Sequence, residues 1–261
     1  MNILYYIEKL FDTYFAYLPR PQPKNTKTNP TFITAHRGAH CSHPLIQENT
    51  HDAFERALDL GCYGIEFDIH ASADNVLVVN HDPTLKRLWG HDIAINALHF
   101  KDIRALVPSL PTLTEVIERY GKRMHLFIEV KAPFDATEAL ADTLKSLIPC
   151  EDYHLLSLEA ATLPLLIPFP KESLLLVPMH NNVNQFCKLS LKQHFGGVLA
   201  HYFLLRDWQI NQLRAAHQLI GVGFVDSKLS LYREINRGIP FLFTNNAADI
   251  MNAFNALATA R

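Results

Sequence analysis

Short apolar runs alternate with amphipathic segments along the chain from residue 31 onward. The apolar runs predict strands at 31–36, 63–69, 76–80, 124–130, 153–158, 173–178, 197–202, 219–225 and 239–244. Apolar residues at every third or fourth position predict helices at 50–60, 112–120, 136–147, 159–167, 184–194, 206–217, 227–236 and 247–258. Because strands and helices alternate, we expect parallel strands joined by right-handed crossovers.

Several of the predicted strands are apolar at nearly every position, for example "SLLLVP" at 173–178. Such strands are typical of sheets that helices cover on both faces. When the run at 76–80 is counted as an extension of the second strand, about eight units result, which predicts an α/β fold of the (β/α)8 TIM barrel type. A doubly wound open sheet is the alternative. Such a sheet more often has a glycine-rich turn after its first strand, and "AHRGAH" at 35–40 is not one.

Residues 1–30 do not follow this pattern. Residues 1–18 place apolar side chains at helical spacing and predict an N-terminal amphipathic helix. Three charged residues, Glu8, Lys9 and Asp12, interrupt the uncharged run that a signal peptide needs. The polar face carries both signs of charge, so membrane contact is not favoured, and we expect packing on the barrel or on a second subunit of a homo-oligomer. The proline-rich residues 19–30 predict a stiff linker, which leaves residues 31–261 as the folded barrel.

The composition narrows the range of partners. The chain has 261 residues, 48% of them hydrophobic, and a net charge of −2, which suits one large core and gives no general attraction to nucleic acid. Its four cysteines are scattered, without a CxxC pair, so they do not indicate a disulfide scaffold. We therefore expect reduced thiols and a cytoplasmic protein.

Acidic residues lie within strands that are otherwise apolar. Glu66 and Asp68 are two positions apart in "YGIEFDIH", so both point to one face with Cα atoms roughly 7 Å apart. Two carboxylates at that separation repel each other unless a cation lies between them. Glu129 in "LFIEVK" is a plausible third ligand from the next parallel strand. An oxygen set of this kind suits Mg²⁺ or Ca²⁺ and does not suit zinc.

Basic residues and histidines occur at the same level of the predicted barrel, where functional side chains of this fold gather. Lys131 lies on the same face as Glu129, where its ammonium group would hold a phosphate oxygen. Arg37 offers a planar fork for the same purpose. His36 and His81, which end two apolar runs, are then available for proton transfer.

These segments together resemble a known family. "AHRGAH…QENTHDAFERALDLGCYGIEFDIHASADNVLVVNHDPTL", followed by "PTLTEVI" and "LFIEVK", resembles the glycerophosphodiester phosphodiesterase family over most of residues 33–131. The resemblance implies a (β/α)8 barrel with a divalent ion, usually magnesium or calcium. It also implies hydrolysis of glycerophosphodiesters to glycerol 3-phosphate and an alcohol. The family carries a small insertion that shapes the substrate entrance, and residues 82–110 correspond to it.

The resemblance also implies a role for each matched residue. His36 and His81 correspond to the acid–base pair, and Glu66, Asp68 and Glu129 correspond to the metal ligands. Arg37 and Lys131 correspond to contacts with the substrate phosphate, and Glu48 in "ENT" corresponds to a supporting glutamate near the metal and substrate. In the implied reaction, a glycerol hydroxyl attacks phosphorus to give a cyclic phosphate that water then opens, and the sequence does not say which histidine acts first.

The chain departs from the family pattern in its second half. The family often has Trp-Thr-Val-Asn on the seventh barrel strand, where this chain has Gly223-Phe224-Val225-Asp226. The usual Thr-Asp-x-Pro after the eighth strand reads Thr244-Asn245-Asn246-Ala247. These differences concern the part of the pocket that selects the leaving alcohol. Two alternatives therefore stay open: a membrane-recruited lysophospholipase D or sphingomyelinase-D-like enzyme, and a non-catalytic barrel that binds phosphodiesters.

Overall fold

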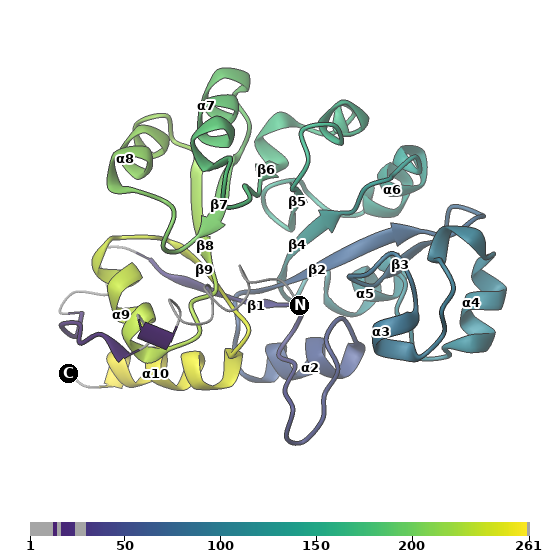
Figure 1. Ribbon diagram of the computed structural model, residues 1–261, viewed down its shortest axis with the longest axis horizontal. Coiled ribbons are helices and arrows are strands. Elements are labelled where there is room, and N and C mark those ends of the chain that lie inside the picture. Colours follow the sequence, from purple (N-terminus) through teal and green to yellow (C-terminus); the bar gives the residue numbers. More distant parts are fainter. Residues whose placement is uncertain (1–12, 15–16, 24–29, 260–261) are drawn as a thin grey trace.

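The computed structural model describes residues 13–14, 17–23 and 30–259, and within them eight parallel strands close into a barrel (Figure 1). In ring order, each strand pairs with the next, and β1 pairs with both β2 and β9, which closes the ring. The strands are β1 (Phe32–His36), β2 (Gly64–Ala71), β4 (His125–Val130), β5 (Tyr153–Ser157), β6 (Leu174–Leu176), β7 (Gly197–His201), β8 (Leu219–Gly223) and β9 (Phe241–Thr244). The predicted (β/α)8 barrel is confirmed, and the open sheet is excluded by this closure.

Helices on the outside of the ring cover the strands (Figure 1). They are α2 (His51–Asp59), α5 (Leu113–Tyr120), α6 (Thr137–Leu144), α7 (Val183–Gln193), α8 (Asp207–Ala215), α9 (Lys228–Asn236) and α10 (Ala247–Thr259). Helix α2 begins where the Thr50 side chain accepts a hydrogen bond from the backbone N–H of Ala53. Helix α5 begins with a reciprocal capping box between Thr112 and Glu115. These local signals explain why the helix starts were predictable.

The predicted helix at 159–167 is wrong. The structure has there only a short 3₁₀ helix, η2 (Leu163–Leu166), followed by a second one, η3 (Lys171–Ser173). Prolines at positions 164, 168 and 170 account for the difference. Proline lacks the amide hydrogen that a helix interior needs, so the apolar spacing of this segment could not be realised as an α-helix.

The strand at 76–80 forms, but as a separate element. Strand β3 (Leu77–Val79) runs antiparallel to β2, with Ile69 opposite Val79, and lies outside the ring of parallel strands. The segment that follows contains α3 (Lys86–Trp89), η1 (Ile95–Ala97) and α4 (Phe100–Leu106), the insertion expected at 82–110. It has a small hydrophobic core of its own, built on Val78, Leu85, Ile95, Ile103, Val107 and Leu110.

The barrel interior below the carboxyl ends of the strands is apolar. Side chains from five different strands form one buried cluster there: Phe127, Leu156, Leu175, Leu199 and Phe243. A larger cluster fills the space between the strands and the helices. Polar groups at the carboxyl ends of the strands therefore lie against a close-packed apolar interior.

The predicted N-terminal helix falls largely outside the described residues. Within the described part, Thr13, Tyr14 and Tyr17 have helical backbone conformation. In the linker, the backbone carbonyl of Pro21 accepts a hydrogen bond of 2.9 Å from the Asn236 side chain of α9. No helix among the described residues is long and apolar enough to cross a membrane. The division of the chain at residue 30 stays a prediction.

Two histidines are buried at the amino end of the barrel. His125 Nε2 lies 2.7 Å from His154 Nδ1, and His125 Nδ1 donates to the backbone carbonyl of Glu151 at 3.0 Å. Since His125 spends its Nδ1 proton on that carbonyl, its Nε2 accepts from His154. Burial lowers the pKa of His125 to about 4, and burial together with the neighbouring His125 lowers the pKa of His154 to about 3.

This pair predicts acid-dependent stability. Both imidazoles are neutral in the folded protein, whereas in the unfolded chain they protonate below a pKa of about 6.5. The unfolded chain thus binds more protons as the pH falls from about 6.5 to about 4, and each histidine lowers the free energy of unfolding by up to about 1.4 kcal/mol per pH unit in that window. Urea denaturation of wild type and of His154→Gln at several pH values measures this slope, which should be shallower in the variant.

The matched control is His217→Gln, because His217 is exposed at the protein surface. This control should leave the slope unchanged, whatever it does to the overall stability. Equal slopes in wild type and His154→Gln would contradict the prediction.

Candidate active site

The turn after β1 places the first basic residues. His36 is the last residue of β1, and Arg37 and Gly38 follow with φ angles of 55° and 78° in the left-handed region. A Cβ atom at Gly38 would lie 2.8 Å from the Cβ of Ala53 in α2, so glycine is required both for its backbone angle and for this close approach. The sharp turn keeps Arg37 beside the carboxyl ends of the strands.

Strand register brings the acidic residues together. His36 is paired with Glu66 across β1 and β2, and Asp68 is paired with Glu129 across β2 and β4. Oxygen atoms of Glu66, Asp68 and Glu129 lie within 4.8 Å of one another, and all three residues are buried. Phe67, between the first two, points the other way and packs against Phe54 of α2. The alternation of side chains along β2 therefore separates the acidic face from the core face.

Burial and mutual repulsion disturb the ionisation of this cluster. Burial and the nearby charge of Asp68 raise the pKa of Glu66 to about 8 and that of Glu129 to about 7. Burial also acts to raise the pKa of Asp68, but the Lys131 and Arg37 charges outweigh it and hold that pKa below its ordinary value. Full ionisation of all three carboxylates is thus unfavourable without a further cation.

The donor set of the cluster fits a divalent cation. The three carboxylate oxygens lie within 4.8 Å of one another, and all three residues are buried. Such oxygens are hard ligands of the kind that Mg²⁺ and Ca²⁺ prefer. A cation there would offset both the burial and the repulsion that raise the pKa values of Glu66 and Glu129. Among the described residues, no other group of three or more acidic, histidine or cysteine side chains has the geometry to hold a metal ion.

Two cations of the protein lie against the cluster. Lys131 Nζ contacts Asp68 Oδ1 at 2.8 Å and forms an ion pair with Glu129. Arg37 Nε lies 3.6 Å from Asp68 Oδ2, and the backbone N–H of Arg37 donates to Glu66 at 3.1 Å. Both side chains also line the pocket, so they combine acidic neighbours with access to a ligand.

Each predicted histidine is held by a hydrogen bond through Nδ1. His36 Nδ1 lies 2.7 Å from Asn245 Oδ1, and its Nε2 lies 3.7 Å from Glu66 Oε2. His81 Nδ1 lies 2.7 Å from the Asp82 carboxylate, which fixes Nδ1 as the protonated nitrogen because a carboxylate only accepts. Burial is the largest cause that lowers the pKa of both histidines.

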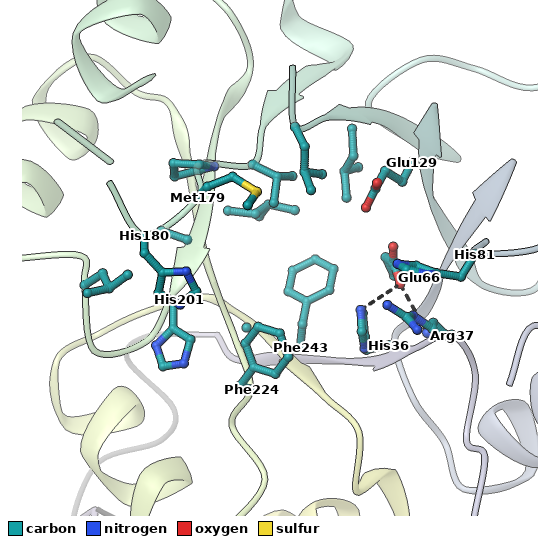
Figure 2. Close-up of a pocket in the computed structure, with 18 of the residues that line it drawn as sticks. His36, Arg37, Glu66, His81, Glu129, Met179, His180, His201, Phe224 and Phe243 are labelled. Atoms are coloured by element: carbon teal, nitrogen blue, oxygen red, sulfur yellow. Dashed lines mark hydrogen bonds and ion pairs between the residues drawn. The ribbon is translucent and has the colours of Figure 1, made fainter. Parts of the chain in front are cut away.

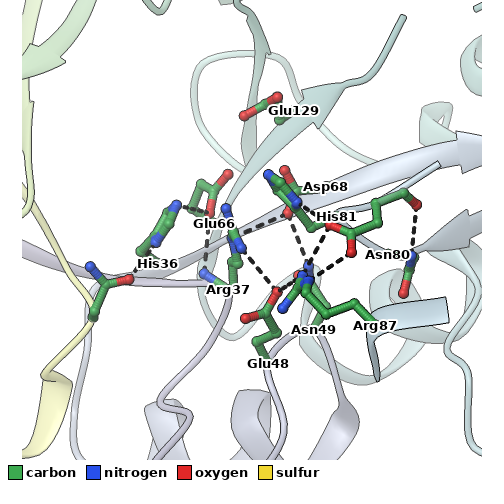
Figure 3. A network of polar contacts seen from close by, with 12 residues as sticks. His36, Arg37, Glu48, Asn49, Glu66, Asp68, Asn80, His81, Arg87 and Glu129 are labelled. Atoms are coloured by element: carbon green, nitrogen blue, oxygen red, sulfur yellow. Dashed lines mark hydrogen bonds and ion pairs between the residues drawn. The ribbon is translucent and has the colours of Figure 1, made fainter. Parts of the chain in front are cut away.

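Glu48 takes part in a network behind the pocket (Figure 3). Its Oε1 accepts from Arg37 Nη1 at 2.9 Å and from Arg87 Nη2 at 2.7 Å. Arg87 in turn donates from Nε to Asp82 at 2.6 Å. Glu48 therefore lies outside the acidic cluster, and it supports the site by holding Arg37. The network links Arg37 to Asp82, the partner of His81.

The site opens into a cavity of about 240 Å³ at the carboxyl end of the barrel. Figure 2 shows the charged groups on one side of this cavity, facing Met179, His180 and His201. The charged side is lined by His36, Arg37, Glu66, His81, Glu129 and Lys131. The rest of the lining is largely apolar and includes Leu156, Leu158, Val177, Pro178, Met179, Leu199, Leu204, Phe224 and Phe243.

The structure brings together the residues that the sequence predicted. All of them except Glu48 and Asp68 line the cavity, and Asp68 lies next to it within the acidic cluster. Sequence reasoning missed Asn245, Arg87 and Asp82 as partners of the site. Asp82 directly follows His81, and Asn245 falls in the altered motif after the eighth strand, so both had an available signal, whereas nothing in the sequence indicates that Arg87 would reach the site.

Comparison with known proteins agrees with this geometry. Residues 36–148 match the model of the glycerophosphoryl diester phosphodiesterase family. A glycerophosphodiester phosphodiesterase from Caldanaerobacter subterraneus is 35% identical over 114 residues, which cover 39% of this chain and 46% of that protein. The matched segment thus spans less than half the length of that relative.

Solved structures extend the likeness over the whole barrel. A glycerophosphodiester phosphodiesterase from Thermotoga maritima superposes with a TM-score of 0.70 at 25% identity, covering 88% of this chain and 98% of that chain. An Oleispira antarctica phosphodiesterase, solved with the product sn-glycerol-3-phosphate, has a TM-score of 0.72 at 20% identity and covers 87% and 98% of the two chains. The sequence match at 36–148, the acidic cluster within it and the shared barrel make this chain similar to the glycerophosphodiester phosphodiesterase family.

Proposed function

We propose that this protein is a metal-dependent phosphodiesterase that hydrolyses glycerophosphodiesters to glycerol 3-phosphate and an alcohol. The observation that carries the proposal is the convergence of three buried carboxylates with two oriented imidazoles and two cationic side chains at one cavity. A phosphodiester needs each of these groups: a metal site, charge to balance the phosphate, and two groups that transfer protons.

Glu66, Asp68 and Glu129 are the residues that would hold the divalent ion, Mg²⁺ or Ca²⁺. When bound, the ion supplies positive charge beside the phosphate and lowers the pKa of a hydroxyl group near it. Arg37 and Lys131 would contact the phosphate oxygens from the same side of the cavity. Their charges favour the transition state, in which negative charge builds up on those oxygens.

The two histidines have different partners, which supports different first roles. His36 faces a neutral amide, so its neutral form is left available as a base. His81 faces the Asp82 carboxylate, which acts to raise its pKa against the effect of burial and so stabilises the imidazolium that an acid needs. In the first step His36 takes the proton of a glycerol hydroxyl, the new O–P bond forms, and His81 protonates the alcohol as its bond to phosphorus breaks.

The second step reverses these roles. Water opens the cyclic phosphate, His81 takes a proton from that water, and His36 returns its proton to the glycerol oxygen. Both imidazoles are then in their starting states. A barrel that only binds phosphodiesters has no need of two imidazoles with fixed orientation, so the catalytic function is favoured over the binding function.

The apolar side of the cavity favours a second candidate substrate. Met179 and Phe224 are 53% and 45% exposed at the rim, and they continue the apolar wall formed by Val177 and Leu204. An alkyl chain would gain from contact with these groups. Lysophospholipids, which share the glycerophosphodiester group but carry one acyl chain, are therefore the runner-up substrate class. The cytoplasmic location and a homo-oligomeric state remain proposals of the sequence.

The metal site predicts sensitivity to chelators. EDTA should abolish turnover, and added Mg²⁺ or Ca²⁺ should restore it, because the carboxylate cluster then regains its cation. Glu66→Gln removes one charged ligand and should raise the metal concentration needed for half-maximal activity. Release of glycerol 3-phosphate from glycerophosphocholine, followed over a metal titration, measures both effects.

Glu118→Gln is the control for the metal titration. Glu118 is exposed on α5, and its substitution removes one negative charge, as Glu66→Gln does. It should titrate like wild type. Full activity in EDTA, with no metal found by elemental analysis, would contradict a metal-dependent mechanism.

The proton-transfer roles predict large losses of rate. His36→Ala and His81→Ala should each lower kcat by roughly 10²–10⁴-fold. The double variant should lose less than the product of the two factors, because groups that act together are not additive. His99→Ala serves as the control, since His99 is exposed on the insertion. Near-wild-type kcat in either single variant would remove that histidine from the proposed role.

The substrate class can be tested at the cavity rim. If the apolar wall binds an acyl chain, Met179→Glu should lower kcat/KM for lysophosphatidylcholine and leave that for glycerophosphocholine nearly unchanged. Ile148→Glu is the matched control, because Ile148 is 51% exposed in the loop before β5, at the other end of the barrel. Equal effects of Met179→Glu on the two substrates would exclude lysophospholipids as the preferred class.

A further inference from the structure

A carboxylate and an amide from two neighbouring strand ends stand behind His36. Asp226 follows β8 and Asn245 follows β9. Asp226 Oδ1 accepts from the backbone N–H of Asn245 at 2.7 Å and from the Thr244 hydroxyl at 2.9 Å. Asp226 Oδ2 accepts from Asn245 Nδ2 at 2.9 Å. The Asn245 side chain is thus held by the same carboxylate that holds its backbone.

The carboxylate decides which way the Asn245 amide points. A carboxylate has no proton to donate, so the NH₂ group of Asn245 must face Asp226. The amide oxygen then faces His36 Nδ1 at 2.7 Å. A hydrogen bond to that oxygen requires a proton on Nδ1. In the neutral imidazole, Nε2 is therefore the free acceptor, and Nε2 is the nitrogen that lies 3.7 Å from Glu66 beside the cavity.

The two positions carry complementary groups, a carboxylate at Asp226 and an amide at Asn245. The hydrogen bonds require such a pair, because one partner must accept only and the other must offer both a donor and an acceptor.

We propose that Asp226 and Asn245 are positioning residues that hold His36 in the tautomer with Nδ1 protonated, so that Nε2 is free to accept a proton from the substrate. This inference rests on the proposed function for its effect on rate. The orientation of the amide and the tautomer of His36 are properties of the protein alone, and they can be measured without a substrate.

The sharpest single change is Asp226→Asn. The backbone N–H of Asn245 can only donate, so it will take the one oxygen that remains at position 226. The new NH₂ group then faces Asn245 Nδ2, two donors oppose each other, and the Asn245 amide turns over. Its NH₂ group will then face His36, which moves the imidazole proton to Nε2. We expect kcat to fall roughly 10²–10⁴-fold, the range for a base that is lost or held in the wrong tautomer, with KM little changed.

The reciprocal double variant Asp226→Asn/Asn245→Asp should restore the arrangement. The carboxylate that this variant carries at position 245 would accept both from the amide at position 226 and from His36 Nδ1, so Nδ1 would again carry the proton. We expect this variant to recover the Nδ1–H tautomer and part of the lost kcat, because the new carboxylate also favours a protonated imidazole and so weakens His36 as a base. Asp249→Asn is the matched control: Asp249, in the first turn of α10, accepts from Asn246 at 2.8 Å and does not contact His36.

Two measurements on each full-length variant test the inference. Nitrogen-15 NMR, with the His36 signals assigned by their absence in His36→Ala, reports which nitrogen carries the proton at a pH where the imidazole is neutral. Steady-state kinetics on glycerophosphocholine reports kcat and KM. Circular dichroism shows whether each variant is folded. An Nδ1–H signal in wild type and in the double variant, an Nε2–H signal in Asp226→Asn, and a matching pattern of kcat support the inference.

Other outcomes overturn it. An unchanged tautomer in folded Asp226→Asn, or a loss of kcat that the double variant does not recover, would show that the pair has only a structural role. If wild type releases no glycerol 3-phosphate while the tautomer changes as expected, the proposed function fails and the positioning of His36 stands.

Discussion

The arrangement of the site depends on three carboxylates that are buried next to one another. Parallel pairing of β1, β2 and β4 brings Glu66, Asp68 and Glu129 to one level, where their oxygens converge within 4.8 Å. Burial and mutual repulsion make this cluster costly, and Lys131 and Arg37 offset only part of the charge. Protonation of the glutamates or a cation between the carboxylates relieves this cost, and the donor set fits a divalent cation.

The orientation of the two histidines at the candidate active site also depends on polar contacts. Each imidazole is held through Nδ1 by one polar partner, and this leaves Nε2 unprotonated in the neutral ring. The partners differ in charge: a neutral amide from beyond β9 for His36, and a neighbouring carboxylate for His81. In the proposed mechanism, that difference separates the base His36 from the acid His81 within one cavity. These partners are held in turn, Asn245 by Asp226 and Asp82 by Arg87. The orientation of both rings therefore depends also on residues that do not face the cavity.

Much of the fold was predictable because local pattern and tertiary environment agree. Apolar strands and amphipathic helices of the right length alternate, and helix starts carry capping residues such as Thr50 and Thr112. The predictions failed where another constraint outweighed periodicity. Prolines turned the helix expected at 159–167 into 3₁₀ turns, and β3 became an antiparallel strand outside the ring. The short helices α3 and α4 of the insertion were not predicted, since their stability comes from a small local core.

The sequence by itself determined the barrel and most of the residues of the site. Glu66, Asp68 and Glu129 can be identified from the sequence because burying an acidic residue inside an apolar strand costs free energy unless a partner offsets its charge. Only the tertiary structure decided what surrounds them. Arg87 reaches Glu48 across 39 positions, and Asn245 reaches His36 across 209. Hydrogen bonds of this kind depend on side-chain direction at the ends of strands that are far apart in the chain. Local periodicity does not predict that direction, because the side chains meet only when the ring of strands closes.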